Sequence, residues 1–248
     1  MLIRTMSGEI ISSVEEWKKL SPPASKDIHW VDGRSAKELA KAWLRNGKAE
    51  VPFEINTILE SHPLTRGLKV EYAIPEYETK LDGYGKGRKH DLFVLAKNNG
   101  ENVVISIEAK ADEPFGLTIR ERLNSKNPKG SNIEKRIIEL KEALFAKNDV
   151  GELRYQLLYG IGGTLIEAKN RNAKLAVFIV HEFLSSKTSP KKTRKNCSDL
   201  NQFVSSLVNT SIELNYGTLF GPIFVSGGSN ISKEIPLLIG KVKTNLTL

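Results

Sequence analysis

Cysteine is almost absent from the sequence, because Cys197 is the only one in 248 residues. A single cysteine excludes an intramolecular disulfide and a zinc site built from cysteine pairs. The four histidines lie far apart in the sequence and lack the short spacing typical of histidine zinc ligands. The sequence therefore favours neither a disulfide-stabilised secreted domain nor a structural zinc site.

Long hydrophobic runs are also missing. No segment approaches the roughly 20 apolar residues that span a bilayer, and residues 1–17 lack the apolar run of a signal peptide. We therefore expect a cytoplasmic protein without a membrane partner. The composition, 40% hydrophobic and 27% charged, is typical of globular proteins. Neither a repeat nor a linker divides the chain, so we predict one domain over residues 1–248.

Positive charge is in excess, with 37 Lys and Arg against 29 Asp and Glu and a formal net charge of +8. Such a balance favours a polyanionic partner such as nucleic acid. Residues 185–197 are predicted to form an exposed basic loop around Pro190. Together with two residues that precede a predicted strand, they supply the candidate nucleic-acid contacts, which are Arg88, Lys89, Lys191, Lys192, Arg194 and Lys195.

The order of predicted elements indicates an α/β fold. Residues 1–50 form an N-terminal helical extension, and a helix with an apolar stripe of Ile55, Ile58 and Leu59 follows Pro52. Residues 69–74, 90–96 and 102–109 are rich in β-branched and aromatic residues and are predicted strands. Asn98-Asn99-Gly100 is a turn that joins the last two strands in an antiparallel hairpin.

The second half of the chain alternates helices and strands. Helical spacing of apolar residues predicts helices over 132–145 and 152–168, and residues 174–183 form a buried strand. After a helical crossover this strand is expected to pair in parallel with its neighbour. A helix over 198–208 and strands over 218–225 and 234–239 complete the prediction. We divide the domain into a core over 51–184 and a C-terminal elaboration over 185–248.

The third predicted strand carries the strongest chemical signal. Side chains alternate between the two faces of a strand, so Glu108 and Lys110 share one face at the end of a strand that is otherwise apolar. Asp91 opens the preceding strand. Counting outward from the Asn98-Asn99-Gly100 turn places Asp91 level with residues 107–110. We therefore predict that the two carboxylates converge, with Lys110 beside them.

Converging carboxylates are typical ligands of a hard divalent cation such as Mg²⁺, with Mn²⁺ as an alternative. A metal held by Asp91 and Glu108 would polarise a phosphoryl oxygen and acidify a bound water. Lys110 would orient or help deprotonate that water, and its charge would stabilise negative charge that develops at phosphorus. A surface ion pair between Glu108 and Lys110 is the structural alternative.

Asp91, followed after sixteen residues by Glu108-Ala109-Lys110, resembles the D-x(n)-E-x-K signature of the PD-(D/E)XK, or restriction-endonuclease-like, nuclease superfamily. The order of a helix, a three-stranded meander, a helix and a strand over residues 51–183 is similar to the core of that superfamily. The stretches EAKADEPFG and RYQLLYG also resemble an uncharacterised bacterial family on this core. The resemblance implies that Asp91 and Glu108 bind metal, that Lys110 serves the attacking water, and that the protein is a nuclease. His90 stands where many members have proline.

The resemblance also suggests two supporting residues. Nucleases of this fold often carry another acid on the first core helix, where Glu54 lies, although Glu54 also suits the first turn of any helix. Gln156 occupies the helix where some relatives carry a site-lining glutamine, on a stripe with Gly160 and Gly163 that would let the helix approach the sheet closely.

Two alternatives to a nuclease stay open. One is a non-catalytic module on the same fold that binds nucleic acid or a protein. The other is a metal-dependent hydrolase of nucleotides, which a closed pocket in place of an open groove would favour. Symmetric cleavage of a duplex requires a homodimer or two successive encounters, so a homodimer also stays open.

Overall fold

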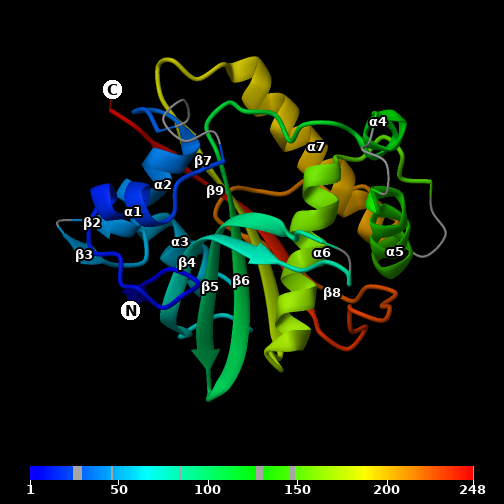
Figure 1. Ribbon diagram of the computed structural model, residues 1–248, viewed down its shortest axis with the longest axis horizontal. Coiled ribbons are helices and arrows are strands. Elements are labelled where there is room, and N and C mark those ends of the chain that lie inside the picture. Colours follow the sequence, from blue (N-terminus) through cyan, green and yellow to red (C-terminus); the bar gives the residue numbers. More distant parts are fainter. Residues whose placement is uncertain (25–29, 46, 84, 127–130, 146–148, 248) are drawn as a thin grey trace.

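A mixed seven-stranded sheet forms the centre of the molecule, with strands in the order β1-β4-β5-β6-β7-β9-β8. The computed structural model describes residues 1–24, 30–45, 47–83, 85–126, 131–145 and 149–247. Helices cover both faces of the sheet (Figure 1), and the buried hydrophobic residues accordingly form two separate clusters. The protein is therefore an α/β protein with three layers.

The strands of the central sheet are β1 (Leu2–Ile3), β4 (Lys69–Thr79), β5 (Arg88–Asn98), β6 (Glu101–Lys110), β7 (Leu175–Leu184), β8 (Leu219–Ile223) and β9 (Leu237–Asn245). Two further short strands, β2 (Leu44–Arg45) and β3 (Lys48–Ala49), pair with each other. One face of the sheet is covered by α1 (Val14–Leu20), α2 (Ser35–Trp43) and α3 (Phe53–Glu60). The opposite face is covered by α4 (Ile119–Asn124), α5 (Ile133–Phe145), α6 (Tyr155–Asn170) and α7 (Pro190–Val208).

The predicted hairpin is confirmed. Strands β5 and β6 pair in an antiparallel ladder that runs from Asn98 opposite Glu101 to Leu92 opposite Ile107. At the turn, Asn99 and Gly100 have φ angles of 49° and 86°. Asparagine and glycine tolerate this left-handed conformation better than other residues, which is why they close tight hairpins.

The parallel part of the sheet also follows the prediction. Strand β7 pairs in parallel with β6, from Val103 opposite Leu175 to Lys110 opposite Glu182, after a crossover that contains α4, α5 and α6. Strand β9 then pairs in parallel with β7. Because helices cover both faces of β7, nearly all of its residues are buried.

The segments that flank residues 51–184 contribute to the same sheet. Strand β1 extends it beyond β4, and β9 and β8 extend it beyond β7. Helix α2 packs against β6 and β7. Among the described residues, no helix combines the length and the hydrophobicity needed to cross a membrane.

The predicted basic loop over 185–197 is wrong in its second half. Helix α7 begins at Pro190 and not at residue 198, so the basic residues occupy its first turns. The physical reason is that proline is favoured in the first turn of a helix, where its fixed φ fits and no hydrogen bond is lost. Lysine and arginine are also good helix formers. The high charge of this segment therefore indicated correctly that it is exposed, but it did not indicate an irregular backbone.

The glycines of α6 bring this helix close to the sheet, as the sequence predicts. A Cβ at Gly160 would lie 3.0 Å from the ring of Phe178 on β7, and a Cβ at Gly163 would lie 2.9 Å from Nε2 of His90 on β5. The ring of His90 is buried and its Nε2 lies 3.1 Å from Oγ1 of Thr79, so the ring is held in place. This close approach sets the depth at which Gln156, on the first turn of α6, sits above β6.

We expect Gly163→Ala to lower the free energy of unfolding by about 1–3 kcal/mol, because overpacking against a rigid buried ring displaces the helix. Gly162→Ala is the matched control. Its Cβ would lie 2.7 Å from Cδ2 of Leu140, the far end of a flexible side chain that can move aside. Alanine also has the higher helix propensity, so the control should lose less stability or gain some. Urea unfolding measures both, and a Gly163→Ala variant as stable as the control would contradict this packing.

Candidate active site

Glu108, Lys110 and Gln156 form a buried triangle at the end of β6. The Nζ of Lys110 lies 2.8 Å from Oε1 of Glu108. The amide of Gln156 joins both, because its Nε2 donates to Oε1 of Glu108 at 2.6 Å and its Oε1 accepts from Nζ of Lys110 at 3.1 Å. The side chains of Lys110 and Glu108 are only 6% and 4% exposed. This pair is therefore not the solvated surface ion pair that was the structural alternative.

Asp91 lies beside this triangle through the register of the hairpin. Because Leu92 pairs with Ile107, Asp91 is level with Glu108, as predicted. Its Oδ2 accepts a hydrogen bond of 2.7 Å from the backbone N–H of Ala109, between Glu108 and Lys110 in the chain. Burial raises the pKa of the Asp91 carboxyl well above its usual range, and the negative charge of Glu108 raises it further.

Lys110 is the cation that offsets these acids. Burial alone would lower the pKa of its ammonium, but the charges of Glu108 and Asp91 outweigh burial and raise the pKa above its usual value. The Nζ atom also lies 5.1 Å from the centre of the Phe115 ring. Lys110 is therefore a fixed, fully protonated cation in this structure.

Glu76 is a third acid at the site, and the sequence prediction missed it. It lies on β4 opposite Asp91, since Pro75 pairs with Leu92 and Tyr77 pairs with His90. Its φ of 51° is unusual for a residue other than glycine. Burial raises the pKa of the Glu76 carboxyl, while Lys89, at 3.2 Å, lowers it and Glu108 raises it again.

A signal for Glu76 was present in the sequence. The predicted strand stopped at Ile74 because proline interrupts most strands, yet Tyr77, Glu78 and Thr79 continue the β-favouring composition after Pro75. Extending the strand across Pro75 would have placed Glu76 level with Asp91 in the meander.

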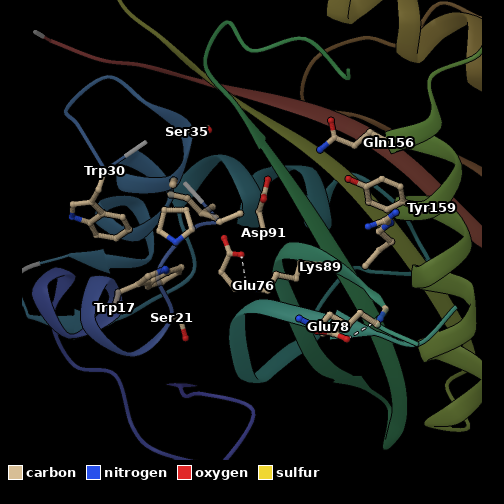
Figure 2. A pocket seen from close by; sticks show the side chains of 17 residues that line it. Trp17, Ser21, Trp30, Ser35, Glu76, Glu78, Lys89, Asp91, Gln156 and Tyr159 are labelled. Carbon is tan, nitrogen blue, oxygen red and sulfur yellow. Dashed lines mark hydrogen bonds and ion pairs between the residues drawn. The ribbon is translucent and has the colours of Figure 1, made fainter. Parts of the chain in front are cut away.

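Asp91 and Glu76 face a cavity of about 480 Å³. Figure 2 shows the two carboxylates between the indole rings of Trp17 and Trp30 on one side and Gln156 and Tyr159 on the other. Three basic residues also line the cavity and come from the start of β5 and the segment before it, namely Lys86, Arg88 and Lys89. The cavity thus joins the N-terminal helices, the β4–β5 pair and the first turns of α6.

The other predicted residues lie elsewhere or have partners. Glu54 does not line this cavity, and its Oε2 is buried without a hydrogen-bond partner among the described residues. Among the basic residues of α7, Lys192 lies 3.4 Å from Asp112 and Lys195 lies 2.6 Å from Asp199. Lys191 and Arg194 are exposed at the start of the same helix. Because Asp112 follows β6 closely, the start of α7 adjoins the end of the strand that carries Lys110.

Comparison with known proteins gives one match. A family model described as a domain of unknown function, DUF6946, matches residues 10–246. The chain belongs to the DUF6946 family. No curated protein and no solved structure matches this DUF6946 protein.

The donor set of the DUF6946 protein suits a hard divalent cation. Asp91 and Glu108 offer carboxylate oxygens, and the raised pKa of Asp91 reflects an excess of buried negative charge that a cation would neutralise. Within the described ranges, no group of three or more His, Cys, Asp or Glu side chains is arranged to hold an ion. A bound Mg²⁺ would therefore take two protein carboxylates and fill its other positions with water or substrate, which is common for this ion.

We expect Asp91→Asn to raise the free energy of unfolding of the DUF6946 protein at neutral pH by about 1 kcal/mol, the usual size of a single-substitution effect. The folded pKa of Asp91 is raised, so the native state binds a proton more tightly than the unfolded state and loses stability as pH rises through this window. Asparagine removes this cost and keeps an oxygen that can accept from Ala109.

Urea unfolding between about pH 4 and pH 8 measures this effect. The difference between variant and native protein should grow as pH rises and disappear near the ordinary pKa of aspartate. A variant that is less stable at every pH would show that Asp91 is a structural residue.

Proposed function

We propose that this DUF6946 protein is a Mg²⁺-dependent nuclease that hydrolyses phosphodiester bonds, with DNA as the more favoured substrate over RNA. The observation that carries the proposal is the meeting of Asp91, Glu108 and Lys110 at the end of β6, where Asp91 faces a cavity. Buried charges lower stability unless they are paired, so two buried carboxylates that share one buried lysine beside a cavity are more typical of a reactive centre than of a folding core.

In this proposal Asp91 and Glu108 hold the metal ion. When bound, Mg²⁺ or Mn²⁺ would polarise a phosphoryl oxygen and lower the pKa of a coordinated water. The hydrogen bond from Ala109 N–H to Asp91 orients that carboxylate, and Gln156 orients Glu108 from the side of α6. Both acids are thus held in fixed positions before a metal binds, which reduces the reorganisation that binding requires.

Lys110 acts as a cation next to the reacting phosphate. The pKa of its ammonium is raised in the metal-free protein, so Lys110 is proposed to donate hydrogen bonds and positive charge to the phosphate or the attacking water. Its contacts with Glu108 and with the amide oxygen of Gln156 fix the direction of its Nζ. Gln156 is accordingly a positioning residue.

The proposal extends to the fold. The order of α3, the antiparallel strands β4, β5 and β6, the helical crossover and the parallel strand β7 supports a restriction-endonuclease-like core. Of the signature residues, Lys110 ends β6, and Asp91, the fourth residue of β5, lies level with Glu108. The formal net charge of +8 supports a polyanionic substrate, with Lys191 and Arg194 on α7 as proposed contacts outside the cavity.

We expect the purified protein to cleave plasmid or single-stranded DNA when Mg²⁺ or Mn²⁺ is added. Asp91→Ala and Lys110→Ala should each lower the rate by at least about 100-fold, because they remove a metal ligand and the stabilising cation. Gel electrophoresis of the products measures the loss. Glu142→Ala and Lys48→Ala, at exposed positions outside the cavity, are the charge-matched controls and should cleave at the native rate.

Cleavage that survives in the Asp91 and Lys110 variants would place the activity in a contaminant or another site. If no DNA or RNA is cleaved and no Mn²⁺ binds in a calorimetric titration, the protein is instead a non-catalytic module on this fold.

Glu76 provides a separate test of the metal centre. We expect Glu76→Gln to weaken Mn²⁺ binding about tenfold, because it removes a negative charge that faces the ligand Asp91. Glu71→Gln is the matched control, since Glu71 also lies on β4 and pairs with a lysine of β5, Lys97, at 2.9 Å. Calorimetric titration of both variants measures the affinity. Equal affinities would show that Glu76 does not act on the metal.

A further inference from the structure

The cavity in front of Asp91 has walls of different chemistry. Trp30, which is half-buried, and Trp17, which is only 2% exposed, line one side of it. The side chains of Lys86 and Arg88 contribute positive charge to the lining. The opposite side holds Gln156 and Tyr159 (Figure 2). The lining thus combines indole rings, cationic side chains and carboxylates, which suit the base, the phosphate and the metal-bound atoms of a nucleotide.

The volume of the cavity fits one nucleotide and not a double helix. A volume of 480 Å³ equals that of a cube with an edge of about 8 Å. A DNA duplex is too wide for this space, because its major groove alone is about 12 Å wide. It also falls within the range of about 300–1,000 Å³ that is usual for small-ligand sites. A base inside a duplex cannot enter such a space without leaving its stack.

A second hollow continues the cationic wall. This hollow, of about 270 Å³, shares Lys86 and Arg88 with the first cavity and adds Arg122. The segment before β5 is fixed there, because Arg136 donates to the carbonyl of Lys86 at 3.0 Å and pairs with Asp82. The guanidinium carbon of Arg88 lies 5.8 Å and 5.9 Å from the ring centres of Tyr155 and Tyr159, so this cation lies beside two aromatic rings of α6.

We propose that the DUF6946 protein binds an unpaired nucleic-acid strand, with one base against Trp30 and the backbone along Lys86 and Arg88 into the second hollow. This inference rests on the proposed nuclease function and names its substrate class. A single free nucleotide would occupy the first cavity alone. The second basic hollow favours a longer strand over a single nucleotide, because the next phosphates of the strand would lie beside its positive charge.

Fluorescence anisotropy in EDTA tests this proposal, because the strand then binds without being cleaved. The probes are a labelled short oligothymidylate and a labelled duplex of the same length, with thymidine monophosphate as competitor. The single strand should bind at least about tenfold more tightly than the duplex, since stacking on an aromatic side chain is available only to unpaired bases. Trp30→Ala should weaken single-strand binding about five- to 150-fold, the range of one base–aromatic stack.

Trp30→Phe should restore most of the affinity, which separates stacking from loss of folding. Phe224→Ala, at an aromatic residue that is 60% exposed and lies outside both hollows, should bind as the native protein does. The proposal is overturned if the duplex binds as tightly as the single strand, or if Trp30→Ala binds normally. It is also overturned if thymidine monophosphate competes as well as the strand, which would identify a nucleotide-hydrolase site.

Failure here is distinct from failure of the nuclease proposal. Binding is measured without metal, so a protein that cleaves nothing still gives an answer. Conversely, a duplex-specific nuclease would pass the cleavage test with Asp91 and Lys110 and fail this one.

Discussion

The register between β5 and β6 determines every contact at the candidate site. Because Leu92 pairs with Ile107, Asp91 reaches the backbone N–H of Ala109 and lies level with Glu108. A shift of one residue would send the side chains of one strand to the opposite face of the sheet and separate the two carboxylates. The tight turn at Asn99 and Gly100 and the apolar residues on both faces hold this register.

The site collects groups that lower stability. Asp91 is buried next to the charges of Glu108 and Glu76, and Glu76 adopts a φ that is unfavourable outside glycine. Lys110 offsets part of the negative charge, and Gln156 satisfies both members of the Glu108–Lys110 pair. A folding core has no need for such an arrangement, and departures from stable packing tend to occur where a protein acts on a ligand. The energetic cost of the acids is therefore the physical basis of the functional proposal.

The sequence predicted the parts of the fold that depend on local pattern and pairing. The alternation of side chains along a strand and the asparagine–glycine turn were enough to predict the β5–β6 hairpin. They also predicted that Glu108 and Lys110 share one face of β6 and that Asp91 lies level with them. The glycine stripe of α6 predicted its close approach to the sheet, and Gln156 does meet Glu108 and Lys110. The start of α7 was missed because charge density indicates exposure and says little about backbone conformation.

Other features depend on tertiary structure. Glu76 was missed because Pro75 interrupted the strand pattern, although the partner strand continues to Arg88. The cavity could not be predicted, since it forms where Trp17 and Trp30, near the N-terminus, meet strands and a helix that lie far away in the sequence. Glu54 was chosen by its position on a helix, and position alone does not tell which cavity a side chain lines.

The most direct test of the central claim is a crystal structure of the DUF6946 protein soaked with Mn²⁺, with anomalous diffraction used to locate the ion. We expect an anomalous peak between the carboxylates of Asp91 and Glu108, with oxygen ligands at about 2.1–2.2 Å, near the Mg²⁺ distance. The opposite result is a structure in which Mn²⁺ binds only at other carboxylates while the Asp91 and Glu108 side chains keep their present contacts. That result would show that these residues do not form a metal centre.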